Sequence, residues 1–368
     1  MAELFLELPI KQWLADDSDL DEEKLRARIV EFADRKYTML ERTQHTLHAR
    51  SYLSPLFVLL LSYLVFSLLN ARFILPGNQA TMIKGVVVVA ILALGQTLII
   101  LTAGIDLSVG YIALLAMMVM AKVFFEQGIT PWLAIIAGLI VGVACGAFNG
   151  ALVTVLNLPP FIATLGTFGI IQASMLLYTQ GKTVLGVDLS DLHLIAGNIP
   201  LRLGDDRGPY SFPIYLGIVV MLVLYIIVGF ALSQTAWGRH VYAVGDDAEA
   251  ARLSGIRVKR VLFSVYTVAG LLYGIGGWMA MGLNSVASPN LLSDDTNLAT
   301  ITAVVIGGTS LFGGRGRVVG TLLGALIYAT FDRGLSLAGA DQQWRVFAVG
   351  VLVLVAVSVD QWIRKVKA

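Results

Sequence analysis

Long apolar stretches separated by short polar segments make up the chain after residue 50. Each stretch approaches the ~20 residues that a helix needs to cross the hydrocarbon core of a bilayer. Ionisable residues are scarce inside them and gather between them. The pattern predicts an all-α polytopic membrane protein with about ten transmembrane helices, at approximately residues 52–70, 81–103, 109–125, 132–156, 161–179, 212–233, 261–283, 298–312, 318–337 and 346–363.

Composition supports a membrane protein and argues against several other classes. The 368 residues are 57% hydrophobic and 14% charged, with a mean hydropathy of +0.78. The single cysteine, Cys145, has no partner for a disulfide, and the four histidines are scattered. With a net charge near +1, we expect membrane lipids around the chain, no nucleic-acid partner and no metal site.

Residues 1–50 differ from the rest because they hold 11 acidic and 8 basic residues. Ser18 and Asp21 have the spacing of a helix capping box, and apolar residues from Leu25 to Leu40 recur roughly on one helical face. A secretory signal has a short basic start and one apolar core, which this segment lacks. We therefore predict a cytoplasmic amphipathic head at 1–50 and a transmembrane domain at 51–368.

Basic residues between the predicted spans predict the orientation. If residue 50 is cytoplasmic, fourteen Lys and Arg fall on the inner side and five on the outer side. Because cytoplasmic loops are enriched in basic residues, we expect both termini in the cytoplasm. The largest outer loop, at about 180–211, reads as a lid or docking surface.

Small and neutral polar residues recur inside the spans. Glycines at four-residue spacing predict close helix packing, at Gly138, Gly142, Gly146 and Gly150, at Gly270 and Gly274, and at Gly316, Gly320 and Gly324. Asp106 in GIDLSVG is interpreted as a structural cap at a turn near the inner membrane face. The neutral polar residues suit a neutral polyhydroxylated solute better than an ion; the candidates for the pathway are Asn149, Thr164, Thr167, Gln172, Asn297 and Thr300.

The glycine-rich segment GGTSLFGGRG at 307–316 is not a phosphate loop, because no lysine follows its glycines. It also lacks the third glycine and the preceding strand of a dinucleotide site. The chain shows no GxSxG or HExxH motif and no paired intramembrane aspartates. We predict a transport subunit and not an enzyme, with no cofactor on this chain.

A polar segment at 235–260 interrupts two apolar stretches. Asp246 or Asp247 can cap a helix that AEAARLS continues, and Gly255 can end it in the left-handed conformation. A helix of about seven residues is marginal in water by itself. It therefore needs a surface to dock on, and its alanines offer a smooth side to a cleft on another protein.

Four blocks now identify a resemblance that covers roughly residues 80–360. They are GQTLIILTAGIDLSVG (95–110), GAFNGALVT with LPPFIATLGT (146–167), TAWGRHVYAVGDDAEAARLSGIRV (235–258) and AVVIGGTSLFGGRGRVVGTLLGALI (303–327). The chain resembles the permease subunits of bacterial ABC importers for ribose, xylose and related monosaccharides, which are similar to the branched-chain amino acid permeases. The resemblance implies that 51–368 is a multi-pass permease domain in the bacterial inner membrane.

The same resemblance implies a role and partners for the polar segment. It looks like the cytoplasmic coupling segment that fits a cleft in the ATPase subunit, with the matching positions Asp247, Glu249, Ala250, Ala251, Arg252, Leu253, Ser254 and Gly255. It also implies two permease copies around one pore, ATP bound on separate ATPase subunits, and a periplasmic binding protein that delivers the sugar. Whether the two copies are identical stays open.

One departure and two alternatives stand beside this interpretation. The family often has Glu-Leu where this chain has Asn297 and Leu298, so a docking or gating role for that acidic residue is in doubt here. The solute could instead be a branched-chain amino acid or a nucleoside. An ion-driven secondary transporter would need intramembrane carboxylates or broken helices around an ion site, and after Asp106 is discounted the spans offer little for one.

Overall fold

The computed structural model describes residues 53–185, 198–203, 212–284, 286–292 and 295–365. The predicted head at 1–50 and most of the predicted outer loop at 180–211 lie outside the described residues. Within this part the chain forms twelve α-helices: α4 (Leu53–Leu69), α5 (Pro76–Leu101), α6 (Val109–Phe125), α7 (Pro131–Thr154), α8 (Pro160–Thr179), α10 (Leu216–Gln234), α11 (Ala236–Asp246), α12 (Ala248–Leu253), α13 (Val258–Asn284), α14 (Asp295–Ile306), α15 (Val318–Leu337) and α16 (Gln342–Lys365).

Every one of the ten predicted apolar stretches contains a helix, so the helical class is confirmed. Six helices are long and apolar enough to cross a membrane: α5, α7, α8, α10, α13 and α15. Helices α4 and α6 have 17 residues each and α14 has 12. The predicted span at 298–312 is wrong at its end, because α14 stops at Ile306 and the glycines that follow turn the backbone.

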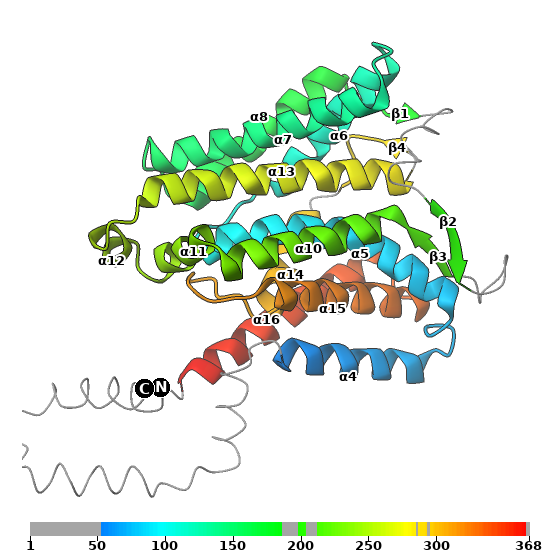
Figure 1. Cartoon of the computed structure of the whole chain (residues 1–368). Helices are drawn as coiled ribbons and strands as arrows, with labels where there is room; N and C mark the ends of the chain where they lie inside the picture. The colour runs from blue at the N-terminus through cyan, green and yellow to red at the C-terminus, as the bar shows by residue number, and fades with distance from the viewer. Residues whose placement is uncertain (1–52, 186–197, 204–211, 285, 293–294, 366–368) are drawn as a thin grey trace, which may run out of the picture. The chain divides into compact units, whose positions relative to one another are not determined.

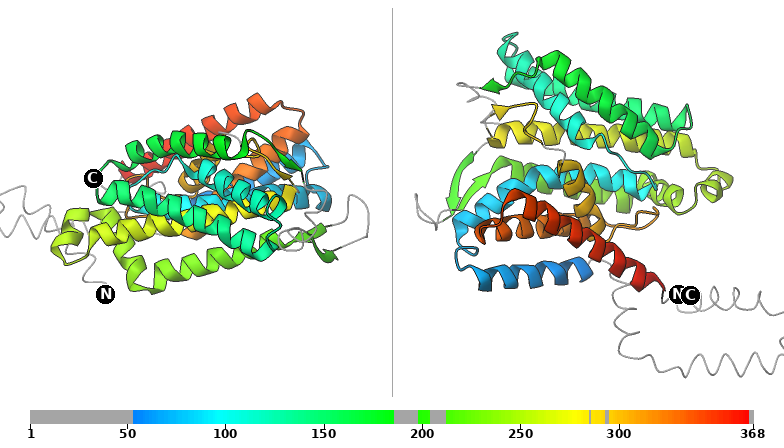
Figure 2. Two further views of the ribbon diagram at one scale, coloured as in Figure 1. Left: turned by 90° about the horizontal axis from the view of Figure 1, so that it is seen from above. Right: turned by 180° about the vertical axis from the view of Figure 1, so that it is seen from behind.

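Four short strands were not predicted. They are β1 (Val184–Leu185), β2 (Asn198–Leu203), β3 (Phe212–Tyr215) and β4 (Val286–Ala287), and they form two antiparallel pairs, β1 with β4 and β2 with β3. In Figure 1 all four lie at one end of the helices, opposite α11 and α12. We call these the strand end and the α12 end; the two views in Figure 2 show the same separation.

The helices form two similar sets that run in opposite directions. In each set a long helix (α5 or α13) is followed by a short one (α6 or α14) and then by two long ones (α7 and α8, or α15 and α16). Helix α5 ends at the α12 end, where α13 begins. The two sets are recognised from the order and lengths of their helices.

Glycines allow the central helices to touch along their backbones, as their spacing predicted. A Cβ atom on Gly146 would lie 2.3 Å from the carbonyl oxygen of Tyr266, and one on Gly270 would lie 2.2 Å from that of Gly142. In the second set, a Cβ on Gly324 would lie 1.9 Å from the Ala303 carbonyl oxygen. Helices α7 with α13, and α14 with α15, therefore approach as closely as two helices can. Gly316 is different, since it lies in the loop before α15.

Burial divides the helices into inner and outer ones. Helix α5 is buried along most of its length after Val86, and so is α13 after Val265. Helices α4, α8 and α10 instead expose rows of large apolar residues, such as Leu68, Leu177 and Ile226. Side chains of this kind suit lipid or another membrane protein.

Candidate functional site

An irregular segment at 102–108 joins α5 to α6 and turns back into the bundle. The Gln96 side-chain amide lies 3.2 and 3.3 Å from the backbone N and O of Asp106. Gln96 precedes the end of α5 by five residues, which corresponds to about 7 Å along a helix. The segment therefore places α6 deeper in the bundle than the end of α5.

Asp106 orders the turn before α6 but does not cap the helix as predicted, because the N-cap of α6 is Ser108. Its Oδ1 atom accepts hydrogen bonds from the Ser108 backbone N at 2.8 Å and the Ser108 Oγ at 2.5 Å. Asn149 in α7 donates from Nδ2 to that Ser108 Oγ at 2.9 Å. Asp106 is 1% exposed and lies alongside α5, and its place near the inner membrane face stays a prediction.

The start of α14 meets the start of α6. Asn297 accepts a hydrogen bond at Oδ1 from the Gly110 N–H, and its Nδ2 donates to the Leu107 carbonyl, both at 2.9 Å. Helix N-termini carry partial positive charge, so two of them converge here inside the bundle. Broken helices of this kind occur at the substrate sites of membrane transporters.

Thr164 fastens the 102–108 segment from the α8 side. Its Oγ1 donates to the Ile105 carbonyl at 3.0 Å and accepts from the Leu107 N–H at 3.2 Å. The structure thus brings three predicted pathway residues, Asn149, Thr164 and Asn297, to one segment.

The other three predicted pathway residues form hydrogen bonds outside this segment. Thr167 and Thr300 are buried and donate to carbonyls of their own helices, those of Thr164 and Asn297. Gln172 is half-buried and donates to the Tyr111 hydroxyl at 2.7 Å. In this conformation most of the set forms helix contacts rather than an open lining.

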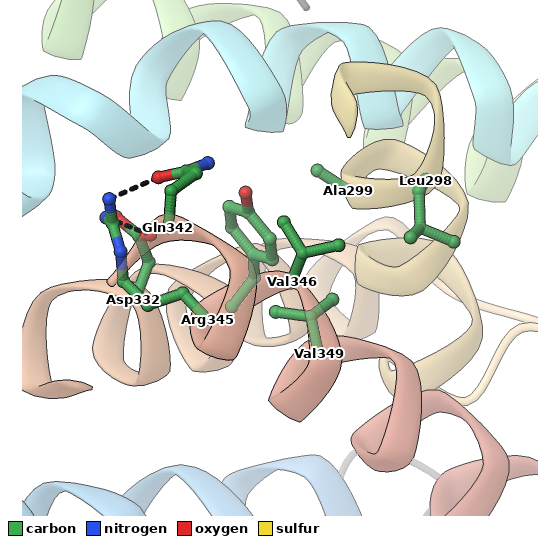
Figure 3. A pocket seen from close by; sticks show the side chains of 8 residues that line it. Leu298, Ala299, Asp332, Gln342, Arg345, Val346 and Val349 are labelled. Atoms are coloured by element: carbon green, nitrogen blue, oxygen red, sulfur yellow. Dashed lines mark hydrogen bonds and ion pairs between the residues drawn. The ribbon is translucent and has the colours of Figure 1, made fainter. Parts of the chain in front are cut away.

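A shallow pocket lies among α14, α15 and α16 (Figure 3). Arg345 crosses it, with its guanidinium bound to the Asp332 carboxylate at 2.7 Å and to the Gln342 side-chain oxygen. These contacts tie α16 to α15. The lining is completed by Leu298, Ala299, Tyr328, Val346 and Val349.

The predicted coupling helix is present as α12. Asp247 Oδ1 accepts from the backbone N–H groups of Glu249 and Ala250, both at 2.9 Å, which is the predicted N-cap. Gly255 has φ +85°, and the Ile256 N–H donates to the Ala251 carbonyl at 3.0 Å, so the helix ends in the predicted left-handed turn.

The structure also shows which side of α12 is covered by its own chain. Ala251 is 5% exposed and belongs to the hydrophobic core, whereas Leu253 is 75% exposed. The remaining predicted coupling positions are all exposed, namely Asp247, Glu249, Ala250, Arg252, Ser254 and Gly255. A large apolar side chain therefore stands among polar groups on the free side of this helix.

One ion pair lies on that free side. Arg252 donates from Nε and Nη2 to the two carboxylate oxygens of Glu249, at 2.9 and 2.5 Å. These hydrogen bonds hold the pKa of Glu249 below its ordinary value and raise the pKa of Arg252. Both side chains are solvated, so the pair orders the helix surface more than it stabilises the fold.

Sequence reasoning missed the helix that supports α12. Residues 236–246 form α11, which is capped by the Thr235 side chain accepting from the Gly238 N–H at 3.2 Å. Its Tyr242 hydroxyl donates to the Gly316 carbonyl at 2.8 Å. The signal was available, since Trp237, Val241 and Val244 recur at helical spacing.

These features define a class: a polytopic helical membrane protein with broken helices at its centre and a short, capped and exposed helix at one end. The family model described as "Branched-chain amino acid transport system / permease component" matches residues 80–357. The chain belongs to this permease family. It is a transport subunit of an ABC import system and not an enzyme, which confirms both predictions.

Proteins named as sugar permeases match this chain over most of their length. The chain is 44% identical over 336 residues to the "Fructose import permease protein FrcC" of Rhizobium meliloti, which covers 90% of this chain and 91% of that protein. The "Ribose import permease protein RbsC" of Bacillus subtilis is 36% identical (84% and 92% covered). The "D-allose transport system permease protein AlsC" of Escherichia coli is 33% identical (84% and 91%). No solved structure gives a significant match.

Proposed function

We propose that this chain forms the membrane pathway of an ATP-driven importer for a monosaccharide, which a periplasmic binding protein delivers. Relatives that are named for fructose, ribose and allose import support the solute class. The neutral amides and hydroxyls around the 102–108 segment agree with a neutral polyhydroxylated solute. Branched-chain amino acids, which the family description names, and nucleosides are the alternatives.

The observation that carries the proposal is the geometry of α12. The Asp247 side chain caps the helix, and Ala251 is buried on its inner side. The outer side exposes Leu253 and the Glu249–Arg252 ion pair. A six-residue helix held this firmly yet left uncovered is suited to a partner's cleft. We assign that partner as the ATPase subunit, where ATP binds, and we place no cofactor on this chain.

The proposed topology has ten spans, with both termini in the cytoplasm of a bacterium and the permease in its inner membrane. Basic residues at the α12 end support this orientation, including Arg239, Arg257, Lys259, Arg260 and Arg315. A second permease copy, most simply an identical one, would complete the pore, and the exposed apolar rows of α4 and α10 would face lipid.

We place the narrow part of the pathway at the meeting of α6 and α14. Asn149, Thr164 and Asn297 hold that meeting closed through hydrogen bonds to residues 105–110. Thr167 and Gln172 lie on α8 and Thr300 on α14, and they would border the solute when α6 and α14 separate. The broken helices do not favour an ion-driven transporter here, because the family is one of ATP-driven import permeases.

Substitutions on the two sides of α12 test the ATPase contact. With the complex reconstituted in proteoliposomes with its ATPase and binding protein, Leu253→Arg and Ala250→Arg should abolish solute uptake. Both positions are exposed, so the variant permeases should keep their wild-type amounts in the membrane. Wild-type uptake by both variants would refute the coupling assignment.

A competition experiment tests the solute. Labelled fructose should enter proteoliposomes, and unlabelled ribose or allose should compete for the cognate binding protein more strongly than leucine or adenosine. Uptake that leucine alone displaces would instead establish an amino acid importer. Uptake that continues without ATP but collapses with the sodium or proton gradient would overturn the ATP-driven mechanism.

A further inference from the structure

The glycine-rich segment at 307–316, which we call the glycine loop, has no role in the function described so far. It joins α14 to α15 at the α12 end. Gly308, Gly313, Gly314 and Gly316 have φ values of +82°, +84°, +67° and +155°. Residues with side chains rarely adopt these conformations, so the path of the loop depends on glycine.

The glycine loop touches the end of α11, one residue before α12 is capped. A Cβ atom on Gly313 would lie 2.4 Å from the Gly245 carbonyl oxygen, and one on Gly314 would lie 2.8 Å from the Asp246 Cα. Asp247, the N-cap of α12, follows directly. The Tyr242 hydroxyl bond to the Gly316 carbonyl makes a second contact between α11 and the loop.

The loop also touches the end of α5. The Gly314 N–H donates to the Leu101 carbonyl at 3.0 Å. The same carbonyl lies 1.8 Å from where a Cβ of Gly245 would be. Ala103, two residues on, has φ +59°, and from there the chain enters the segment that carries Asp106. Three backbones thus meet at Leu101, Gly245 and Gly314 without a side chain between them.

We propose that this three-backbone junction transmits movement of α12 to the 102–108 segment, so that the glycine loop is a second coupling element beside α12. The inference rests on the proposed function, in which the ATPase moves α12. Flexible side chains would absorb a small displacement, whereas backbones in direct contact pass it on. The path runs from Asp247 through Gly245 and Gly314 to Leu101, and from there to Asp106 and the starts of α6 and α14.

The junction is tested with the whole importer, as permease, ATPase and binding protein in proteoliposomes. The readout is the number of labelled fructose molecules imported per ATP hydrolysed. Tyr242→Phe removes one hydrogen bond between α11 and the loop without a change in shape, and should lower this ratio about two- to tenfold. Gly245→Ala forces the backbones apart and should lower it further, while ATP hydrolysis continues. Labelled ribose or allose replaces fructose if fructose is not imported.

Gly85→Ala is the matched control, because Gly85, like Gly245, lies in a helix but has nothing within 4 Å of its Cβ position. It should keep the wild-type ratio. If Gly245→Ala fails to assemble, Tyr242→Phe decides alone. A wild-type ratio in Tyr242→Phe, and in any assembled Gly245→Ala complex, would overturn the junction. The proposed function fails separately, if Ala250→Arg and Leu253→Arg also transport normally.

Discussion

The α7–α13 contact and α12 are both rich in small residues, but the space beside those residues differs. At Gly146 and Gly270, an added Cβ would lie within 2.3 Å of a backbone oxygen on the facing helix. On α12 only Ala251 is covered, and Ala248 and Ala250 face outward. The fold itself therefore excludes a larger residue in the first region, whereas on the exposed side of α12 only the proposed ATPase contact would exclude one.

The largest expected effect comes from a large side chain placed in the α7–α13 contact. Gly146→Leu would place a side chain where the Tyr266 carbonyl lies, and should destabilise the fold by about 3 kcal/mol or more. We expect little folded protein, measured as the monodisperse fraction after detergent extraction. A well-folded Gly146→Leu variant would show that the helices can separate at this contact.

A matched pair on α12 gives the next largest effect. Ala251→Arg forces a charged side chain into the buried side and should lower the local stability of α12 by about 1 to 3 kcal/mol. Ala250→Arg adds the same side chain on the exposed side and should leave it unchanged. Hydrogen–deuterium exchange of the 247–256 amides measures both. Equal exchange in the two variants would contradict the assignment of the inner side.

A helical glycine that faces open space is the opposite case to Gly146. Gly166 lies in α8 and has nothing within 4 Å of its Cβ position. Because alanine loses less backbone entropy than glycine in a helix, Gly166→Ala should raise the stability by at most about 1 kcal/mol. Thermal unfolding in detergent checks this. A marked loss of stability would mean that α8 is covered on this side.

The smallest effect should come from the solvated ion pair on α12. The pKa of Glu249 is lowered, so the pair contributes above the ordinary carboxylate pKa and is lost as the pH falls through the lowered value. At neutral pH, Glu249→Gln should speed amide exchange in α12 only about twofold or less. In the wild type, amide exchange in α12 should speed up as Glu249 is protonated at acidic pH, and the variant should lack this change. A large change at neutral pH would assign the pair a structural role.

Local patterns were enough to predict much of this protein. Apolar length located a helix at all ten predicted stretches, because a helix in a bilayer satisfies its own backbone hydrogen bonds. Glycine spacing predicted close packing by the helices that became α7 and α13, and Asp246 or Asp247 with Gly255 predicted both ends of α12. Each of these signals acts between residues close in the sequence.

The site depended on contacts between distant residues, which no local pattern encodes. Asn297 and Gly110 are 187 residues apart, and their hydrogen bond joins the two short helices. Thr164 and Asn149 were predicted as pathway residues because they are polar, but only the fold shows that they fasten the 102–108 segment. The repeated arrangement of α5–α8 and α13–α16 likewise was recognised only in the fold.

The sequence by itself thus determined the class, the helices and both ends of the short helix α12, since hydrophobic length, glycine spacing and capping are short-range effects. Only the tertiary structure decided which side of α12 is free, how deep Asp106 lies, and that Gly245, Gly314 and Leu101 share one junction. The reason is physical: burial and backbone contact depend on which segments meet, and those segments are more than a hundred residues apart along the chain for Leu101 and Gly245.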